Sequence, residues 1–486
     1  MRLSELLARL PGASVHGDAG VTVTGITHDS RRVQPGWIFA ACPGARHHGL
    51  EFLPQAVARG AAAVLSDRTA DGAPDVVWIT SSDPRGHMAL AAWALAGDPQ
   101  ERLLLAAVTG TNGKSTTIDL LRAILEAHGF PTAMIGTLGY FLPGETAAAE
   151  RTTPEATDLA PFLARHAAGG GRAVVMEASS HALMLKRLQG LRFQIGVWTN
   201  LTRDHLDFHG DMESYFAAKS LLFSRHLAAD GRRVLPLDEP WGARLLGEPQ
   251  PGDVSWGLHA GRVHTAAARS DLSGSRIELD LDGTVLAVRL RLVGEHNLRN
   301  AVAAAAAAHA AGVSAEVIRR GLEAARPLPG RLERVAERLP FPVFVDYAHT
   351  PEGLRSVLSS LRALGEHRLI VVFGAGGDRD RGKRGPMGEA VGKLADVAIV
   401  TSDNPRSEDP AAIAEAVVAG VRAAGAEPEL ELDRRQAIAR ALHLADARSV
   451  VVVAGKGHED VQQIGAQRIP FLDRSVVLEL ADEVSG

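Results

Sequence analysis

The chain has 486 residues, which exceeds the size of one ordinary domain and predicts about two to four domains. Its formal net charge of −5 at pH 7 gives no basic footprint, so we expect no nucleic acid as a partner. Cys42 is the single cysteine, so neither a disulfide framework nor a thiolate metal site is expected.

The N-terminus and the apolar stretches indicate a cytoplasmic protein. Residues 1–10 begin like an amphipathic helix and lack the sustained apolar core and the cleavage site of a signal peptide. The longest apolar stretch, residues 301–308, is dominated by alanine and is too short to cross a membrane. We therefore expect no membrane insertion.

Short strands and helices alternate over residues 1–98, which predicts a small α/β domain without a glycine-rich phosphate loop. We expect strands at residues 21–26, 37–41, 62–65 and 76–79, and helices at residues 53–59 and 88–95. Two polar segments, residues 27–31 and 44–49, could hold a polar ligand at strand ends, although such segments are more often solvated turns.

Residues 103–117, LLLAAVTGTNGKSTT, are the most informative stretch of the chain. The apolar run at 103–108 is typical of a strand buried on both faces of a parallel sheet. A glycine loop follows, and apolar residues then recur at helical spacing as far as Gly129, a candidate C-terminal cap. Strand, loop and helix N-terminus in this order form a cradle for phosphate groups.

The loop has the short form G-x-x-G-K-S, because Val108 stands where the general P-loop pattern has a glycine. Lys114 can reach terminal phosphates, and a hydroxyl of the next two residues can hold Mg²⁺. A strand–helix turn with an incidental lysine is the alternative, and the order of the elements argues against it. The candidate ATP-binding residues are Gly110, Thr111, Asn112, Gly113, Lys114, Ser115 and Thr116.

Further polar groups follow apolar runs in the central region. Thr152 and Thr153 are expected to open a helix with their hydroxyls at its cap. Glu177 follows the run 174–176, and an acidic residue at the end of a strand beside a P-loop is where Mg²⁺ needs a ligand.

Residues 202–209 are dense in Asp and His, which indicates metal or phosphate chemistry. A helix capped by Asp204 with exposed histidines is the alternative reading. His205 and His209 could hold zinc, but no third soft ligand is near in the sequence, and phosphate chemistry favours magnesium. Lys219 interrupts a rather apolar helix at 215–223, and by default such a lysine extends to solvent.

The remaining chain predicts a hairpin and a second α/β unit. Residues 277–281 and 285–291 alternate as antiparallel strands around Asp282-Gly283. After a linker at 327–330, strands expected at 343–346, 369–373, 397–401 and 450–454 alternate with helices, which predicts a doubly wound parallel sheet. The basic glycine-rich loop 374–384 follows a buried strand, so we expect it to meet an anion rather than only solvent.

The motifs TGTNGKST, TTP, MEASSHAL, TNLTRDHLD and AAKSLLF together resemble those of the Mur ligases of peptidoglycan synthesis. The resemblance covers the whole chain, with motifs in order in all three regions. It implies an α/β fold class with three domains: a small N-terminal α/β domain at 1–98 for the UDP end of the substrate, a central P-loop ATPase-type parallel-sheet domain at 99–329, and a C-terminal Rossmann-like doubly wound domain at 330–486 for the incoming amino acid.

The resemblance also implies roles for individual residues. Lys114, Glu177, His205 and Lys219 would be catalytic, and Ser115, Glu177, His205 and Lys219 would serve Mg²⁺. Lys219 would be carbamylated, since CO₂ on a neutral buried lysine creates an anion that can support a metal ion. The UDP-substrate would contact Ser30, Thr152, Thr153, Ser179 and Arg187. Further ATP contacts would come from Asn297, Arg331 and Asp346.

The motif at residues 403–406 resembles the form in family members that add diaminopimelate. This substrate carries an amino acid group at both ends, so specificity requires recognition of the far carboxylate and ammonium. An arginine fork, Arg406, can bind that carboxylate, and Glu459 can accept from the ammonium. The implied binding residues are Arg379, Asp403, Asn404, Pro405, Arg406, Gly455 and Glu459.

The implied reaction is acyl-phosphate ligation for cell-wall synthesis, and thereby for cell shape and division. The expected small-molecule substrates are ATP, UDP-N-acetylmuramoyl-L-alanyl-D-glutamate and meso-diaminopimelate, with Mg²⁺ as cofactor and the chain as a monomer. The alternatives are the same reaction with L-lysine, a folylpolyglutamate synthase-like ligase, and a non-catalytic nucleotide switch. His296 and Pro236 depart from the usual family pattern, which leaves the adenine contacts within 234–300 open, whereas the departure at Ala375 is not expected to change the reaction class.

Overall fold

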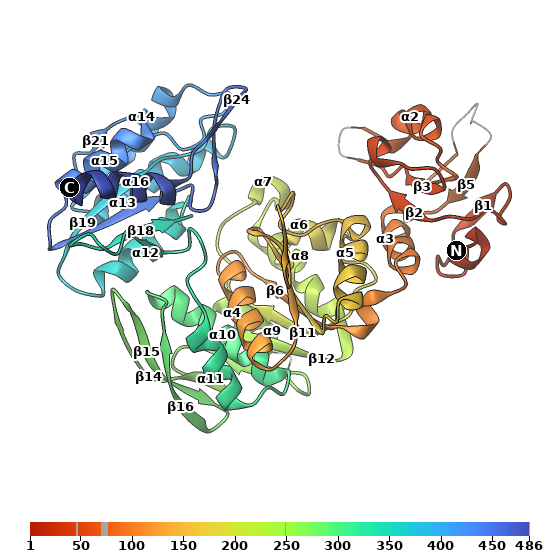
Figure 1. The fold of residues 1–486 in the computed structure, drawn as a ribbon, viewed down its shortest axis with the longest axis horizontal. Coiled ribbons are helices and arrows are strands. Elements are labelled where there is room, and N and C mark those ends of the chain that lie inside the picture. The colour runs from red at the N-terminus through yellow and green to blue at the C-terminus, as the bar shows by residue number, and fades with distance from the viewer. Residues whose placement is uncertain (45–46, 70–75, 248, 486) are drawn as a thin grey trace. The chain divides into compact units, whose positions relative to one another are not determined.

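The computed structural model describes residues 1–44, 47–69, 76–247 and 249–485. They form two compact units, Met1–Ser255 with Ala306–Val313, and Trp256–Ala305 with Ser314–Gly486. Figure 1 labels the elements along the chain. Among the described residues, no helix is both long enough and apolar enough to cross a membrane.

The first unit begins with a five-stranded sheet in the order β1-β5-β4-β3-β2, parallel except for β1. Its elements are α1 (Leu3–Leu7), β1 (Ser14–His16), β2 (Gly25–Thr27), β3 (Trp37–Ala40), α2 (Leu53–Ala58), β4 (Ala63–Ser66), β5 (Val77–Thr80) and α3 (Pro84–Leu95). The strand expected at 21–26 starts only at Gly25, because Val21 and Val23 bond to the backbone of Leu3 and Met1 instead. The predicted small α/β domain is otherwise confirmed.

Seven strands of the eleven-stranded sheet belong to this unit, in the order β12-β11-β6-β10-β7-β8-β9. The first five of these strands are parallel, and β8 and β9 turn back as antiparallel edge strands. The strands are β6 (Leu104–Thr109), β7 (Thr132–Gly136), β8 (Gly139–Leu142), β9 (Glu145–Ala147), β10 (Ala173–Glu177), β11 (Phe193–Trp198) and β12 (Leu227–Pro236). The helices are α4 (Lys114–Ala127), α5 (Ala156–Ala168), α6 (Ser180–Met184), α7 (Leu206–His209), α8 (Met212–Arg225) and α9 (Pro240–Leu246).

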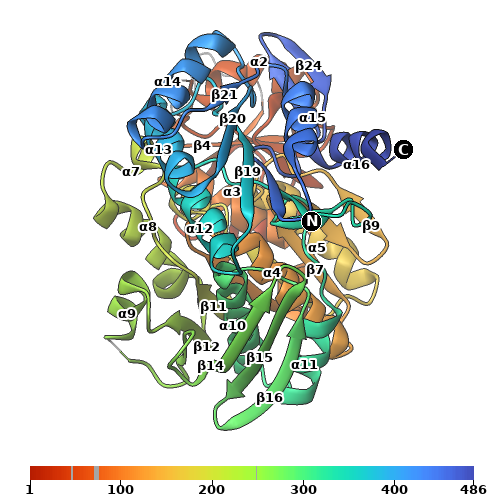
Figure 2. The same ribbon diagram turned by 90° about the vertical axis from the view of Figure 1, so that its left-hand side faces the viewer.

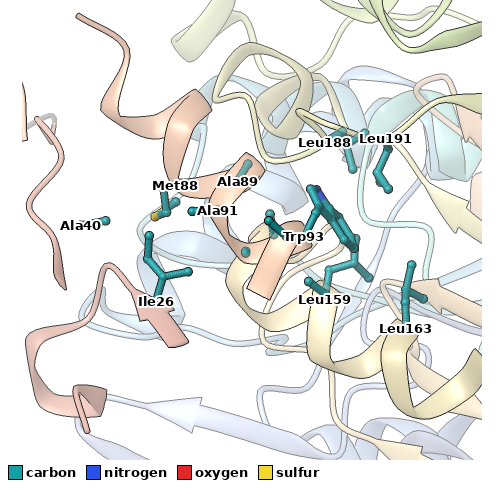
Figure 3. Close-up of a cluster of buried hydrophobic side chains, with 14 of the residues drawn as sticks. Ile26, Ala40, Met88, Ala89, Ala91, Trp93, Leu159, Leu163, Leu188 and Leu191 are labelled. Carbon is teal, nitrogen blue, oxygen red and sulfur yellow. The ribbon is translucent and has the colours of Figure 1, made fainter. Parts of the chain in front are cut away.

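One hydrophobic core joins the two sheets of the first unit. The indole of Trp93 points from α3 towards Leu159 on α5 and towards Leu188 and Leu191 (Figure 3). Its Nε1 donates to the carbonyl of Gln189 at 2.9 Å. The core therefore fixes the small sheet against the larger one, and full burial of such an aromatic side chain stabilises the fold by roughly 1.5–3 kcal/mol.

The second unit contains an antiparallel sheet and a doubly wound sheet. The antiparallel strands are β14 (Val263–Asp271), β15 (Gly274–Leu281) and β16 (Thr284–Leu290), which confirms the hairpin around Asp282-Gly283. β13 (Val254–Trp256) and α10 (Glu295–Ala310) lie where the chain passes between the units, and α11 (Ala315–Ala324) follows.

The doubly wound sheet has the order β17-β18-β22-β19-β20-β21, parallel except for β17. Alternate residues of β19 point to opposite faces: Val371 packs in the core beneath α12, α13 and α14, and Ile370 in the core beneath α15 and α16 (Figure 2). Its elements are β17 (Glu333–Val335), β18 (Val343–Asp346), α12 (Pro351–Arg362), β19 (Arg368–Phe373), α13 (Arg384–Leu394), β20 (Val397–Val400), α14 (Pro410–Ala423), β21 (Glu429–Leu430), α15 (Arg434–Leu444), β22 (Ser449–Ala454), β23 (Val461–Ile464), β24 (Gln467–Pro470) and α16 (Asp473–Ser485). The predicted Rossmann-like unit is confirmed.

Candidate active site

The P-loop connects β6 to α4 and is held by the end of β11. Gly110 has φ +149°, and a Cβ there would clash with Thr199 Oγ1, so only glycine fits. The carbonyl of Asn200 accepts from Thr111 N at 2.8 Å, and Asn200 Oδ1 accepts from Asn112 N at 3.0 Å. These contacts fix the loop at a helix N-terminus, where backbone N–H groups favour phosphate.

Lys114 is the first residue of α4, after Gly113 at its N-cap. Its ammonium donates to the carbonyls of Gly110 at 3.1 Å and Thr111 at 2.9 Å. The positive charge is therefore held directly over the loop. Thr116 lies buried in the first turn of the same helix.

Glu177 ends β10, the strand next to β6, and is 1% exposed. Its Oε1 accepts hydrogen bonds from Ser115 Oγ at 2.7 Å and from Thr137 N at 2.9 Å. The hydroxyl of Thr137 also donates to Oε2 at 3.2 Å and lies 3.1 Å from Thr152 Oγ1. The site offers only oxygen ligands at this point, a donor set that suits Mg²⁺ shared with substrate phosphates.

Lys219 is buried on α8, 2% exposed, so the expectation that it extends to solvent is wrong. Its Nζ donates to the carbonyl of Gly110 at 2.6 Å and lies 4.8 Å from the centre of the Tyr215 ring. Burial, assisted by the charge of Lys114, holds the pKa of Lys219 well below its usual value. A buried lysine of this kind carries a neutral amine more readily than an exposed one does.

The histidines after β11 gather around Tyr215. His205 is the N-cap of α7, with φ +52°, which replaces the expected cap at Asp204. Its ring lies 5.0 Å from that of His181 and 6.2 Å from that of Tyr215. Partial burial lowers the pKa of His205, and the charges of Lys114 and Lys219 act in the same direction. His205 and Lys219 thus both approach the ring of Tyr215.

The described residues contain no group of three or more His, Cys, Asp or Glu side chains that could hold a metal ion by itself. His209, which the zinc alternative required, instead approaches Ser180 Oγ with its Nε2 at 2.9 Å. A protein-only zinc site formed by His205 and His209 therefore has no support within the part of the chain that the structure describes.

Thr153, Ser179 and Arg187 lie together beside Glu177. Thr153 Oγ1 donates to the carbonyl of Glu177 at 2.7 Å and lies 3.2 Å from Ser179 Oγ, and Arg187 donates to the carbonyl of Thr153 at 3.1 Å. The expectation that Thr152 and Thr153 cap a helix is wrong. The helix, α5, starts at Ala156, and the hydroxyls bond to other segments instead.

Three arginines surround the buried carboxylate of Glu155. The distances are 2.9 Å to Arg187, 3.7 Å to Arg151 and 3.8 Å to Arg85. Three cations on one carboxylate leave a net positive charge. Arg187 Nε is paired with Glu155, whereas Arg85 Nη1 is buried and makes no hydrogen bond within the described residues. Because buried donors without a partner cost free energy, this cluster suits an anionic ligand.

Ser30 makes its side-chain hydrogen bond to Gln55 and not to the residues around Glu177 or Glu155. It is 6% exposed, and its Oγ donates to Gln55 Oε1 at 2.6 Å. Its neighbour Arg32 pairs with Asp158 at 2.7 Å. Burial lowers the pKa of His28; the charge of Glu155 opposes this shift and that of Arg151 adds to it.

In the second unit, Asp346 ends β18 and is buried. Its carboxylate accepts from Leu332 N at 2.6 Å and from Ala348 N at 2.7 Å. Burial raises the pKa of Asp346, and the charge of Arg331 opposes that shift. The guanidinium of Arg331 lies 4.9 Å from the centre of the Tyr347 ring, which orients it next to the end of the strand.

The segment 403–406 follows β20 and is tied to the β23–β24 hairpin. Asn404 Nδ2 donates to Glu459 Oε2 at 2.6 Å, and Asn404 Oδ1 accepts from Gln463 N at 2.8 Å. Arg406 has φ +53° and directs its Nη1 to the carbonyl of Gly377 at 2.7 Å. Asn404 and Arg406 from one segment and Glu459 from another are therefore held by specific bonds.

Asp403 and Gly455 complete this group. A Cβ on Gly455, which has φ +117°, would lie 2.6 Å from Asp403 Oδ2, so glycine is required there. Burial and the charge of Asp403 raise the pKa of Glu459, whereas Lys456 opposes the shift. Asn404 N donates to Asp403 Oδ1 at 2.6 Å. Pro405 lies between these anchored residues.

The buried side chain of Arg434 binds both segments that carry Asp403 and Gly455. Arg434 forms a bidentate pair with Asp473, with both side chains 0% exposed and both contacts at 2.7 Å. Its guanidinium also donates to the carbonyls of Ser402 at 3.4 Å and Ala454 at 3.0 Å. These carbonyls directly precede the segments that carry Asp403 and Gly455.

Two predicted residues do not join these groups. Asn297 is buried at the start of α10, where its Nδ2 donates to the carbonyl of Val293 at 2.9 Å. Arg379 is exposed in the loop after β19. In that loop, Arg381 and Arg384 pair with Glu408 at 3.1 and 2.8 Å, so part of its positive charge is neutralised within the chain.

Sequence reasoning missed Thr137, Tyr215, Arg85 and Arg434. Tyr215 precedes Lys219 by four residues, so helical spacing could have placed its ring over the lysine. Thr137 follows β7 just as Glu177 ends β10, and the ends of neighbouring parallel strands meet. Arg434 and Arg85 carried no local signal, because their partners lie far away in the sequence.

A P-loop beside a buried carboxylate and a buried lysine defines a nucleotide-dependent α/β enzyme. Three family models match the chain: "Mur ligase family, catalytic domain" at residues 22–95, "Mur ligase middle domain" at 108–308 and "Mur ligase, glutamate ligase domain" at 330–457. The chain belongs to the Mur ligase family.

Individual relatives agree with this assignment. A Solibacter usitatus protein named UDP-N-acetylmuramoyl-L-alanyl-D-glutamate–2,6-diaminopimelate ligase is 43% identical over 99% of this chain and 98% of its own length. A solved structure of a ligase with the same name is 32% identical, with a TM-score of 0.72, over 100% of this chain and 99% of that one. A Mycobacterium tuberculosis folylpolyglutamate synthase complexed with ADP is 22% identical, with a TM-score of 0.64, over 76% of this chain and 91% of that one, and shares the fold alone.

Proposed function

We propose that this chain is an ATP-dependent ligase that adds meso-2,6-diaminopimelate to UDP-N-acetylmuramoyl-L-alanyl-D-glutamate. The observation that carries the proposal is the match to diaminopimelate-adding ligases over the full length of the chain. The bonded group of Asn404, Arg406 and Glu459 supports it, since an arginine fork and a carboxylate suit the far end of diaminopimelate.

The reaction proceeds in two steps. A D-glutamyl carboxylate oxygen attacks the γ-phosphorus of ATP, so that an acyl phosphate forms and ADP leaves. The amine of diaminopimelate then attacks the acyl carbon, phosphate leaves from the tetrahedral intermediate, and the new amide nitrogen loses a proton. Lys114 and the N-terminus of α4 stabilise the phosphate charge, so catalysis rests on positioning and electrostatics.

Magnesium belongs to this proposal. Ser115 and Glu177 would hold it together with the ATP phosphates, and His205 and carbamylated Lys219 would support a further ion. Bound there, Mg²⁺ neutralises charge on the transferred phosphoryl group. The buried oxygen cluster around Glu177 fits such an ion, and the lowered pKa of Lys219 fits the neutral amine that CO₂ requires.

The remaining predicted residues have defined places in the proposal. Thr152, Thr153, Ser179 and Arg187 hold the acidic peptide end of the nucleotide substrate, and Arg85 and Arg151 add positive charge beside them. Ser30 serves the uridine end, and Arg331 and Asp346 serve ATP, with Asn297 near the adenine. Residues 1–98, 99–329 and 330–486 are assigned as the domains for UDP-substrate, ATP and amino acid, in a monomer that supplies cytoplasmic cell-wall precursors.

Phosphate release tests the proposal directly. The full chain is given ATP, Mg²⁺, the UDP-dipeptide and either meso-diaminopimelate or L-lysine. We expect turnover with diaminopimelate and little with lysine, which lacks the far carboxylate. Equal turnover with both amines would keep the ligase and refute the specificity. Turnover only with a folate and glutamate would favour the folylpolyglutamate synthase-like alternative, and no phosphate release at all would revive a nucleotide switch.

A further inference from the structure

Three arginines lie directly opposite one another on the antiparallel sheet of the second unit. In the strand register, Arg269 on β14 faces Arg276 on β15, and Arg276 faces Arg289 on β16. Directly opposite residues of antiparallel strands point to the same side, and neighbouring strands lie about 4.8 Å apart. The three cationic side chains therefore project from the same face of the sheet in a straight row, which we call the arginine row.

The arginine row is exposed, and the charge of Arg276 contributes to lowering the pKa of nearby Asp271. Within the described part of the chain, no carboxylate forms an ion pair with Arg269, Arg276 or Arg289. The nearby acid Glu323 pairs with Arg319 at 2.7 Å, and its other oxygen accepts from the backbone of Arg289. Like charges directly opposite one another destabilise a sheet.

A hollow of about 630 Å³ lies over the row. Four arginines line it, the three of the row and Arg291, together with the hydroxyls of Ser270 and Ser273 and the carboxylates of Asp271 and Glu323, so its cations outnumber its acids. Sites for small molecules commonly have volumes of about 300–1,000 Å³, so the hollow has the size of such a site. The lining offers guanidinium and hydroxyl donors, which suit an anion with many oxygen atoms.

We propose that the arginine row is a second anion site, built from residues other than those of the P-loop, that binds a small molecule with two or three linked phosphate groups. Guanidinium groups bind phosphate oxygens in bidentate fashion. A single phosphate could engage only part of a row of three forks. A chain of linked phosphates can engage all three at once and remove their mutual repulsion.

Inorganic tripolyphosphate is the probe for the binding test, measured by calorimetry on the full chain. We expect two binding events, one at the P-loop and one at the row. The variant with Arg269→Gln, Arg276→Gln and Arg289→Gln should keep one event only. The matched control is Arg262→Gln, which replaces the arginine directly before β14 that pairs with Asp282 at 2.6 Å, and this variant should keep both binding events. Equal stoichiometry in wild type and the triple variant would overturn the proposal.

Thermal unfolding provides a second, independent readout. Without the probe, Arg276→Gln should raise the unfolding midpoint, because it removes the central cation that faces both neighbours. Added tripolyphosphate should raise the unfolding midpoint of the wild type by more than it raises that of this variant. Monophosphate at equal ionic strength should bind the row about tenfold or more weakly, since it loses at least one charge-assisted hydrogen bond. Equal affinity for both anions would refute the preference for linked phosphates.

Discussion

Ser115 Oγ donates a 2.7 Å hydrogen bond to Glu177 Oε1, which links the first turn of α4 to the carboxyl end of β10. The two residues meet because β6, which leads into the P-loop, pairs in parallel with β10, with Val108 opposite Glu177. A hydroxyl and a carboxylate thus share one position beside the phosphate loop, as a ligand pair for Mg²⁺ requires.

Glu177→Gln should lower kcat by roughly 10²-fold, because the amide cannot offer a negative charge where phosphate charge develops. The substitution keeps an oxygen that can accept from Ser115 and Thr137, so the fold should persist. Steady-state rates over a series of Mg²⁺ concentrations test this. An unchanged Mg²⁺ dependence would show that Glu177 does not serve the metal.

Lys219 should make activity depend on CO₂. Its buried amine, with a lowered pKa, can react with CO₂ to give an anion. Wild-type turnover should fall in CO₂-free buffer and return with bicarbonate, with a ¹³C carbamate signal from labelled bicarbonate. Lys219→Met, of similar length, should have low activity and no response to bicarbonate. Full wild-type activity without CO₂ would refute the carbamate.

Strands and their ends were predictable because buried parallel strands carry continuous apolar runs. The run 103–108 and the run 174–176 each lie in a strand within one or two residues of the expected bounds. Helix ends in the polar segments were less predictable. Thr152 and Thr153 have the composition of a cap, but their hydroxyls have better partners in Thr137 and Glu177, and the helix starts later.

Burial of a charged residue could not be derived from its neighbours in the sequence. Lys219 is buried because the carbonyl of Gly110, far away in the chain, accepts from it. Arg434 is buried because Asp473 and two loop carbonyls accept from it. Each partner becomes adjacent only when separate strands assemble into a sheet. Periodicity alone predicts solvent exposure for both residues.

Arg406→Lys should show whether the site needs the two parallel N–H groups of a guanidinium or only a positive charge. Lysine keeps one positive charge but cannot bind a carboxylate through two parallel N–H groups. We expect KM for meso-diaminopimelate to rise by roughly tenfold or more, with little change in KM for ATP. Steady-state kinetics with each substrate varied in turn measure this. An equal rise in both Michaelis constants would indicate a general structural defect instead.

Glu459→Gln should have opposite effects on the stability of the fold and on the turnover of diaminopimelate. Burial and the charge of Asp403 raise the pKa of Glu459, so the folded state binds its proton more tightly than the unfolded state. Its contribution to stability is therefore present at low pH and is lost as pH rises above the ordinary carboxyl range near 4.5. Above that range the glutamine variant should unfold at a higher temperature than wild type, yet turn over diaminopimelate more slowly. A lower midpoint at pH 7 would contradict this sign.

Arg434 should position the amino acid site without touching the substrate. Arg434→Met leaves Asp473 as an unpaired buried charge and should destabilise the second unit by about 3–5 kcal/mol. The double variant Arg434→Met with Asp473→Leu removes both charges, so much of that stability should return. The carbonyls of Ser402 and Ala454 would still lack their donor, so KM for diaminopimelate should stay high while KM for ATP does not change. Recovery of both stability and the wild-type KM in the double variant would show that Arg434 has a purely structural role.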